Sequence, residues 1–161
     1  MFRTVLTSAA LAFALATGAA AVAAPAPLPP ADSGIIRRPS AYSVDETVAK
    51  IKADVAAKGI KWFSETDQSE LGRPVNITLS RSVLVQFGNP PLGLQFLTAS
   101  PYAGLDWPVR MLVFQDADGH VWMAWTDFQW IAKRHHIENR AAQFKMAGEV
   151  AASIAHSAEA P

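Results

Sequence analysis

Apolar residues recur at helical spacing near the start of the folded part of the chain, and they predict an amphipathic helix there. Four aliphatic residues follow one another at intervals of four, three and four positions: Val44, Val48, Ile51 and Val55. This spacing places them on one face of an α-helix. Ser43 with Glu46 three residues later is the pattern of a capping box, and Gly59 supplies a left-handed stop.

Short apolar runs that end near glycine, proline or aspartate predict strands. We expect them over residues 35–41, 60–65, 83–87, 109–116 and 120–126. Ala117-Asp118-Gly119 predicts the turn of a hairpin between the last two. Residues 68–81 contain Gly72 and Pro74 and predict a polar connection without regular structure. Gly88-Asn89-Pro90-Pro91 predicts a turn.

Further helices are predicted over residues 94–99, from Asp127 as cap to His136, and after Asn139 as cap. The last helix carries an apolar stripe: Phe144, Ala147, Val150, Ala151 and Ile154. The elements therefore follow one another in the order β-α-β-β-α-β-β-α-α. This order predicts an α+β fold, a two-layer sandwich with a mostly antiparallel sheet of about five strands and helices on one face.

The hairpin at residues 109–126 carries apolar residues on both of its sides. If Asp116 pairs opposite Gly119, one side holds Arg110, Leu112, Phe114, Val121, Met123 and Trp125, and the other holds Met111, Val113, Gln115, His120, Trp122 and Ala124. A sheet covered on one face should alternate apolar with polar residues. We therefore expect the second face to meet the terminal helix, a second subunit or a ligand.

The first 34 residues differ in composition from the rest of the chain. Residues 1–23 combine Arg3, an uncharged apolar run and small residues before a cleavage point near Ala23 or Ala24, which is the pattern of a signal peptide. The run is too rich in alanine to predict a stable membrane span. Residues 24–34 are rich in proline and alanine and predict an extended tether. We expect a folded domain over residues 35–137, then a C-terminal helix and tail over 138–161.

Charge and cysteine content narrow the partners and the location. Removing residues 1–23 takes only Arg3 from the 14 basic residues and leaves the 14 acidic ones, so the remaining charge is slightly negative. Neither nucleic acid nor an anionic membrane is favoured. The absence of cysteine excludes disulfides, thiolate chemistry and a lipid-attachment cysteine. We expect a protein of the periplasm or the medium, which meets the membrane only through its uncleaved signal during export.

Most sequence patterns of catalysis and metal binding are missing. There is no phosphate-binding glycine loop, no nucleophile elbow and no His-x-x-x-His pair. His135 and His136 are adjacent, so on a helix their side chains diverge by roughly 100°. Asp116-Ala-Asp118-Gly119 starts like a calcium loop but lacks its third acidic position and its distal glutamate. We interpret it as the hairpin turn, and we expect neither a metal site nor a cofactor.

Four phrases between Leu84 and Ile137 carry a family resemblance: Leu84-Val-Gln-Phe-Gly-Asn-Pro, Pro101-Tyr-Ala-Gly-Leu-Asp-Trp-Pro, Val113-Phe-Gln-Asp-Ala-Asp-Gly and Arg134-His-His-Ile. In combination they resemble the bacterial domain-of-unknown-function 302 family. The resemblance covers residues 41–137 and implies a compact α+β domain, without an established chemistry. Members often carry histidine after the aspartate that ends the second strand, where this chain has Asp67-Gln68. The departure argues against an enzyme, or at least against a metal-dependent one.

These phrases supply the candidate ligand-binding residues: Asn89, Asp106, Trp107, Arg134 and His135. Asn89 either caps the following helix or presents its amide to a bound molecule, and Trp107 stands where the family more commonly has a smaller aliphatic residue. Arg134 has Asp127 and Asp106 as candidate partners. His135 would close a helix C-terminus, and it is also the one catalytic candidate, because imidazole changes charge near neutral pH.

Three functions are consistent with these patterns. The first is a non-catalytic exported binding module that holds a small apolar or aromatic ligand, or a protein partner, near Asn89 and Asp106. The second is an enzyme of unknown reaction that uses His135 with Asp106 or Asp127. The third is a structural role through homodimerisation, which a concentration-dependent dimer without a ligand requirement would distinguish from the first.

Overall fold

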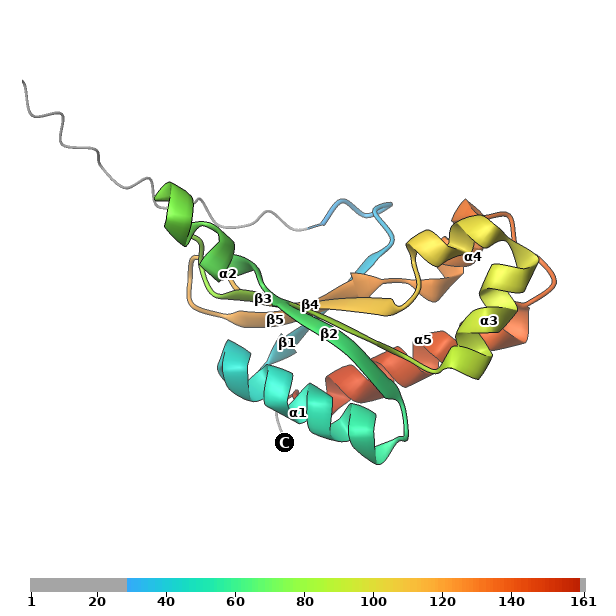
Figure 1. Cartoon of the computed structure of the whole chain (residues 1–161), viewed down its shortest axis with the longest axis horizontal. Helices are drawn as coiled ribbons and strands as arrows, with labels where there is room; N and C mark the ends of the chain where they lie inside the picture. Colours follow the sequence, from blue (N-terminus) through green and yellow to red (C-terminus); the bar gives the residue numbers. More distant parts are fainter. Residues whose placement is uncertain (1–28, 160–161) are drawn as a thin grey trace, which may run out of the picture.

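The computed structural model describes residues 29–159, which form a single antiparallel sheet with helices packed on it (Figure 1). The sheet has five strands in the spatial order β1-β5-β4-β3-β2. Their bounds are β1 (Ile35–Ser40), β2 (Lys61–Asp67), β3 (Ser82–Gly88), β4 (Val109–Gln115) and β5 (Val121–Thr126). The predicted signal peptide and the start of the predicted tether lie outside the described residues.

The helices gather mainly on one face and at the two ends of the sheet. They are α1 (Val44–Ala57), α2 (Gln68–Leu71), α3 (Pro90–Ala99), α4 (Phe128–Arg134) and α5 (Ala141–His156), with 3₁₀ turns η1 (Arg73–Val75) and η2 (Pro101–Leu105). In Figure 1, α1 and α5 lie side by side beneath the sheet, α3 and α4 lie at one end, and α2 lies at the other. The predicted α+β class, the order of elements and the antiparallel sheet are confirmed. Within residues 29–159, no helix is long and apolar enough to cross a membrane.

The helix predicted from spacing alone, α1, has the expected start and stop. The backbone N–H of Glu46 donates to the Ser43 hydroxyl at 3.3 Å, and the backbone N–H of Ser43 donates to the Glu46 carboxylate at 3.0 Å. Gly59 has a φ of +66°, in the left-handed region that ends helices. The aliphatic stripe of α1 is buried against the sheet.

The segment between β2 and β3 is more regular than its sequence predicts. Residues 68–71 form the one-turn helix α2, because the Asp67 side chain accepts a hydrogen bond from the Glu70 N–H at 3.3 Å and caps it. Residues 73–75 form η1, which ends at Asn76 with a φ of +56°. The prediction of an unstructured connection over residues 68–81 was therefore wrong for its first half.

Two predicted helix starts were also wrong. The turn at Gly88-Asn89-Pro90-Pro91 is already the start of α3, in which Asn89 is the cap. Proline suits a first helical turn, because the N–H that it lacks would have no partner inside the helix. The last helix, α5, is capped at Arg140 without a side-chain hydrogen bond, so Asn139 is not its cap.

The β4–β5 hairpin pairs one residue away from the predicted register. The Asp116 N–H donates to the His120 carbonyl at 2.9 Å, and Gln115 pairs with Val121. The buried face therefore holds Met111, Val113, Val121, Met123 and Trp125, and the outer face holds Arg110, Leu112, Phe114, Trp122 and Ala124. A three-residue loop with Gly119 at φ +87° causes the shift.

The outer face of the sheet is not covered by the terminal helix, because α5 packs beside α1 on the opposite face (Figure 1). Its apolar side chains are half-buried, and the guanidinium of Arg37 stacks on the ring of Trp122 at 3.7 Å. Of the alternatives that the sequence left open for this face, a second subunit and a ligand remain.

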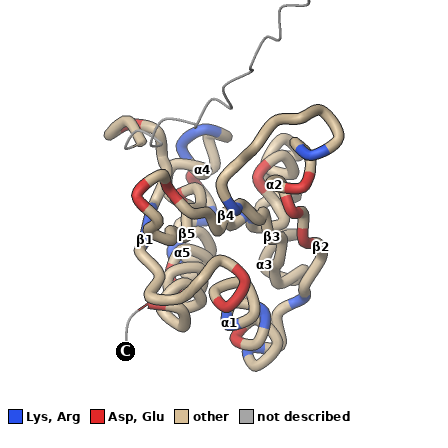
Figure 2. The backbone as a smooth tube through the Cα atoms, turned by 90° about the vertical axis from the view of Figure 1, so that its left-hand side faces the viewer, with Lys and Arg blue, Asp and Glu red and all other residues tan. Residues whose placement is uncertain are grey.

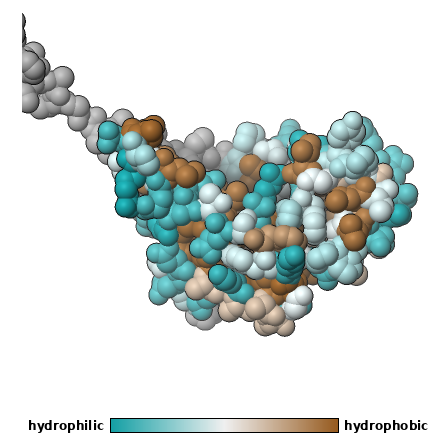
Figure 3. All heavy atoms as spheres, in the orientation of Figure 1, coloured by the Kyte–Doolittle hydropathy of each residue, from teal (hydrophilic) through white to brown (hydrophobic). Residues whose placement is uncertain are grey.

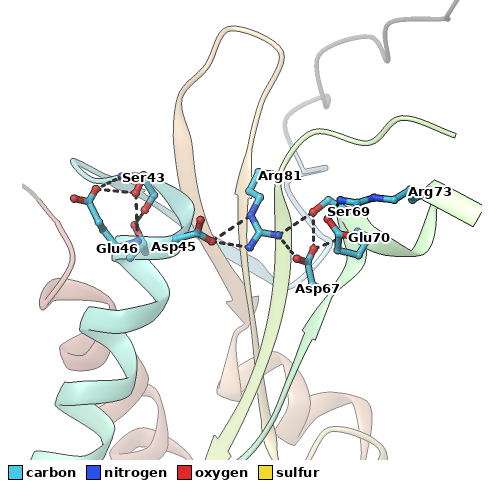
Figure 4. A network of polar contacts seen from close by, with 9 residues as sticks. Ser43, Asp45, Glu46, Asp67, Ser69, Glu70, Arg73 and Arg81 are labelled. Carbon is cyan, nitrogen blue, oxygen red and sulfur yellow. Dashed lines mark hydrogen bonds and ion pairs between the residues drawn. The ribbon is translucent and has the colours of Figure 1, made fainter. Parts of the chain in front are cut away.

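Arg81 joins three segments at the α2 end of the sheet (Figure 4). Its guanidinium donates to Asp45 at the start of α1 at 2.6 Å, to Ser69 at 2.9 Å and to Asp67 at the end of β2. The Ser69 hydroxyl holds the pKa of Asp67 below its usual range, Arg81 adds to the effect, and burial opposes it. Figure 2 shows that such acidic and basic positions are interspersed on this side of the molecule.

Candidate functional site

Asp106 and His135, 29 residues apart, meet in the interior. Asp106 follows η2, and His135 closes the C-terminus of α4. The His135 Nε2 lies 2.6 Å from the Asp106 Oδ2, and the side chains are only 6% and 5% exposed. A carboxylate only accepts hydrogen bonds, so Nε2 carries the hydrogen and donates it. The position of His135 as the helix cap is as predicted.

Two arginines surround the same carboxylate. The Arg134 Nη1 lies 3.3 Å from each Asp106 oxygen, and the Arg110 Nη2 lies 3.5 Å from Oδ1. Of the two partners considered for Arg134, the structure selects Asp106. Both arginine side chains are about half exposed, at 44% and 49%, so they keep part of their hydration while compensating the buried charge. We refer to Asp106, Arg110, Arg134 and His135 as the Asp106 cluster.

The space beside the Asp106 carboxylate is too small for a substrate, whereas Arg134 also borders an open surface hollow of about 570 Å³. The hollow next to Asp106 has a volume of about 10 Å³ and is lined by Val109, Arg110, Thr126, Phe128 and Ile131. One water molecule is the most that such a volume holds. Asp127, the other proposed partner of His135, caps α4 from the opposite end by accepting from the Gln129 N–H at 3.0 Å. The geometry of the cluster therefore suits fastening η2 to α4.

A larger apolar cavity lies between the sheet, α3 and α5, with a volume of about 260 Å³. Its lining is mainly aromatic and aliphatic: Ile60, Phe87, Leu92, Phe96, Trp107, Val109, Phe128, Met146, Ala147, Val150 and Ala151, with Gly88, Lys58 and Asn89. Met146 is 54% exposed, and Lys58 and Asn89 are also exposed. These three residues mark the mouth of the cavity.

Trp107 forms one wall of this cavity because two glycines leave room for its ring. A Cβ placed on Gly93 would lie 2.1 Å from the ring atom Cε2, and one on Gly88 would lie 3.2 Å from Nε1. On its other side the ring meets Phe63 edge-on, with centroids 5.4 Å apart. The position of the Trp107 ring thus depends on glycine at position 93 of α3.

Of the two roles that its sequence position suggested for Asn89, the structure shows the helix cap. Its Oδ1 accepts a hydrogen bond from the Leu92 N–H at 3.4 Å, which caps α3. Its amide nitrogen donates to no other described residue and lies at the mouth of the cavity. The predicted site residues therefore separate into two places: Asn89 and Trp107 line the cavity, while Asp106, Arg134 and His135 form the cluster behind it.

Sequence reasoning missed the residues that α1 and α5 contribute to the cavity. Lys58 follows α1, and its ammonium pairs with Asp54 one turn earlier. The pair was visible in the sequence as an i,i+4 spacing, but its place at a cavity mouth was not. Met146 and Val150 lie on α5 among the apolar residues of that helix. The sequence pattern does not distinguish apolar residues that line a cavity from those that fill the core.

The hairpin turn brings the ligand atoms of Asp116, Asp118 and His120 within 4.8 Å of one another. Asp116 accepts from the N–H groups of Asp118 and His120 at 3.0 and 2.8 Å, and from the Trp122 indole at 2.7 Å. The Trp122 hydrogen bond is the main reason that the pKa of Asp116 lies below its usual range. Both carboxylate oxygens are thus engaged in shaping the turn.

The fold, the buried cluster and the apolar cavity define a small α+β domain with an apolar cavity beside a separate cluster of buried polar side chains. The chain belongs to the family described as domain of unknown function DUF302, whose model matches residues 36–159. The crystal structure of an uncharacterized conserved protein DUF302 from Bacillus stearothermophilus shares the fold, with a TM-score of 0.72 at 11% identity over 78% of this chain and 98% of that chain.

Curated relatives include proteins named Fluoride-specific ion channel FluC 1, from Brucella suis and from Brucella abortus. Each is 32% identical to this chain over 106 residues, which is 66% of this chain. The matched part covers 42% and 39% of those two proteins, so this chain spans about two fifths of their length.

Proposed function

We propose that this protein is a non-catalytic binding module that holds a small apolar ligand in the cavity between the sheet, α3 and α5. The observation that carries the proposal is the size and lining of this cavity. Its volume of about 260 Å³ exceeds the ~150 Å³ of an apolar cavity that admits benzene. Four aromatic side chains, those of Phe87, Phe96, Trp107 and Phe128, contribute to its walls.

The residues around the cavity support binding more than chemistry. Neither histidine nor a carboxylate is among the described residues that line it. General acid–base catalysis most often uses such a group within hydrogen-bond reach of the reacting atoms, and the one lysine among the described lining residues, Lys58, is paired with Asp54. Asp106 adjoins Trp107 in sequence, but its carboxylate belongs to the cluster behind the wall.

Titration with N-phenyl-1-naphthylamine, an uncharged aromatic probe whose fluorescence rises in apolar surroundings, tests the proposal. We expect a saturable signal from the wild-type protein. Ala147→Leu places a larger side chain in the cavity and should weaken binding by roughly ten-fold or more. Ala142→Leu makes the same change on the exposed side of α5 and should leave binding unchanged. Absence of saturation, or equal affinity in both variants, would contradict the proposal.

The alternative of an enzyme that uses His135 has less support. Asp106 orients the imidazole ring by accepting a hydrogen bond from Nε2 at 2.6 Å, as an acidic partner does in many catalytic pairs. The hollow of about 10 Å³ that adjoins Asp106 leaves no room there for a reacting group. The pairing of His135 with Asp127 has no support, because Asp127 caps the first turn of α4.

Self-association is a second candidate function, and exposed apolar residues favour it. Brown spheres cover the tip of the α2–η1 segment in Figure 3. Large aliphatic residues of residues 68–81 are 43–65% exposed: Leu71, Val75, Ile77 and Leu79. The neighbouring outer face of the sheet adds the half-buried Leu84, Leu112, Phe114 and Trp122. Such patches often mark contacts between proteins.

Sedimentation velocity over a concentration series tests this second candidate. We expect a dimer whose population rises with concentration and falls in Leu112→Glu, which puts a charge on the outer face. Leu94→Glu changes an exposed leucine of α3 and serves as the control. A monomer at all concentrations would exclude self-association as the function.

Export is part of the proposal for the protein as a whole. It is supported by the signal-peptide pattern of residues 1–23. Cell fractionation with mass spectrometry of the mature N-terminus should place the protein outside the cytoplasm, with cleavage near Ala23 or Ala24. An intact Met1 in the cytoplasmic fraction would contradict export. The ion conduction in the names of the longer relatives is not part of the proposal.

A further inference from the structure

From the polar groups at the mouth of the cavity, we infer that its ligand is an uncharged, mainly apolar molecule with one hydrogen-bond acceptor, such as a ketone, ester or ether oxygen, at the end that faces solvent. The inference rests on the proposed function and specifies the class of ligand. The hydrogen-bonding groups and the charges of Lys58, Asn89 and Asp54 at the rim support this class of ligand.

The polar side chains of the rim offer more hydrogen-bond donors than acceptors. Lys58 and Asn89 are the polar side chains among the described lining residues. An ammonium group only donates. The Asn89 Oδ1 accepts from the Leu92 N–H at 3.4 Å and keeps one lone pair, while its amide nitrogen donates to no described residue. An acceptor on the ligand therefore finds donors on both residues, whereas a donor on the ligand finds only the remaining lone pair of Asn89.

The charge at the rim is already balanced. The Lys58 ammonium forms an ion pair with Asp54, one turn earlier in the same helix. Their side chains are 33% and 21% exposed, so the pair is partly shielded from water. A ligand carboxylate approaching Lys58 would also approach Asp54, and the like charges would repel each other. The carbonyl end of α1, which Lys58 follows, has partial negative charge as well.

The other helix end at the mouth, the start of α3, does not supply an anion site. Its first two residues are Pro90 and Pro91, which have no N–H to donate. The next N–H, of Leu92, donates to Asn89, and that of Gly93 donates to the Asn89 carbonyl at 2.9 Å. The backbone donors that normally attract an anion to a helix start are therefore missing or occupied.

Three probes with one shared ring system separate these requirements: naphthalene, 2-acetylnaphthalene and 2-naphthoate. Isothermal titration calorimetry near neutral pH should give 2-acetylnaphthalene an affinity roughly 2- to 12-fold above that of naphthalene, from one hydrogen bond. We expect 2-naphthoate to bind more weakly than the ketone. Binding of 2-naphthoate above the ketone, or equal binding of ketone and naphthalene, would overturn the inference. Failure of all three to bind would instead count against the proposed function.

Two variants test the rim directly. Lys58→Met should reduce the ratio of ketone affinity to naphthalene affinity, with both affinities measured in the same variant. Asp54→Asn leaves the Lys58 charge without its partner and should raise 2-naphthoate affinity by roughly two- to five-fold. Lys52→Met is the matched control, because Lys52 lies on α1 away from the cavity and contacts Trp62 and Glu65. Unchanged 2-naphthoate affinity in Asp54→Asn would overturn the charge argument.

Discussion

Asp106 is the residue on which most buried polar contacts near the cavity depend. It is 8% exposed as a whole residue and contacts His135, Arg134 and Arg110. Such a carboxylate contributes stability only while its partners stay in place, because an unpaired buried charge is costly. The same contacts hold the His135 imidazole at the C-terminal end of α4.

Asp106→Asn should therefore destabilise the fold. The substitution keeps the shape of the side chain but removes the charge that compensates two arginines, and we expect a loss of about 1–3 kcal/mol in the free energy of unfolding. Urea unfolding followed by tryptophan fluorescence measures it. Asp118→Asn, at an exposed position of the hairpin turn, should change stability little. Equal stability of Asp106→Asn and wild type would show that the cluster does not hold η2 on α4.

At the scale of elements, α3 and α5 each carry a glycine in the helix interior, with opposite roles. A Cβ on Gly93 of α3 would lie 2.1 Å from the Trp107 ring. A Cβ on Gly148 of α5 would lie 3.9 Å from the Phe128 Cβ, an ordinary contact. Glycine in a helix interior is unfavourable by ~1 kcal/mol relative to alanine, so α3 retains it for space and α5 has no such need.

Gly93→Ala and Gly148→Ala should therefore shift stability in opposite directions. We expect Gly93→Ala to cost about 1–3 kcal/mol through overpacking and to weaken binding of the naphthylamine probe, because Trp107 must move. Gly148→Ala should stabilise by about 0.5–1 kcal/mol. Thermal unfolding of both variants checks this, and a stabilised Gly93→Ala would show that the Trp107 ring moves freely.

Local signals explain which elements could be predicted from the sequence. The capping box and stripe of α1 involve residues at most four positions apart, and the sequence contains all of them. The prediction of the β4–β5 register was wrong because both faces of the hairpin are apolar, so the sequence pattern does not distinguish between the possible pairings. A shift of one residue exchanges the two faces. The prediction of where α3 begins was wrong because Asn-Pro-Pro occurs both in turns and at helix starts.

Across the whole molecule, the sites are built from segments that are distant in sequence, which is why the sequence predicted them only partly. The cavity is lined by residues from separate segments, among them Lys58 after α1, Trp107 after η2 and Met146 on α5. The motif phrases identified Trp107 and Asn89, and they also contained both members of the Asp106–His135 pair. No local pattern marks Lys58 or Met146 as neighbours of these residues.

Asp67, whose pKa is lowered first by the Ser69 hydroxyl and further by Arg81, makes the stability of the molecule depend on acid pH. Because the pKa of folded Asp67 is lowered, the contribution of Asp67 to stability is present above its pKa in the unfolded chain and is lost as pH falls through the lower, folded value.

We expect stability to fall between about pH 5 and pH 2, and the fall to be smaller in Arg81→Met. Urea unfolding over this pH range measures it, with Arg73→Met, which removes an exposed pair with Glu70, as control. Identical pH profiles of Arg81→Met and wild type would contradict this role.

Asp106 and Trp107 are consecutive residues, yet one belongs to the buried cluster and the other to the cavity wall. If the ligand that we propose displaces the Trp107 ring, it also shifts the backbone that carries the Asp106 carboxylate, and cavity occupancy is then coupled to the docking of α4. Such a coupling would be reciprocal, so that tighter docking of α4 would favour ligand binding. The NMR signals of the His135 imidazole, which does not line the cavity, should consequently report whether the cavity is filled.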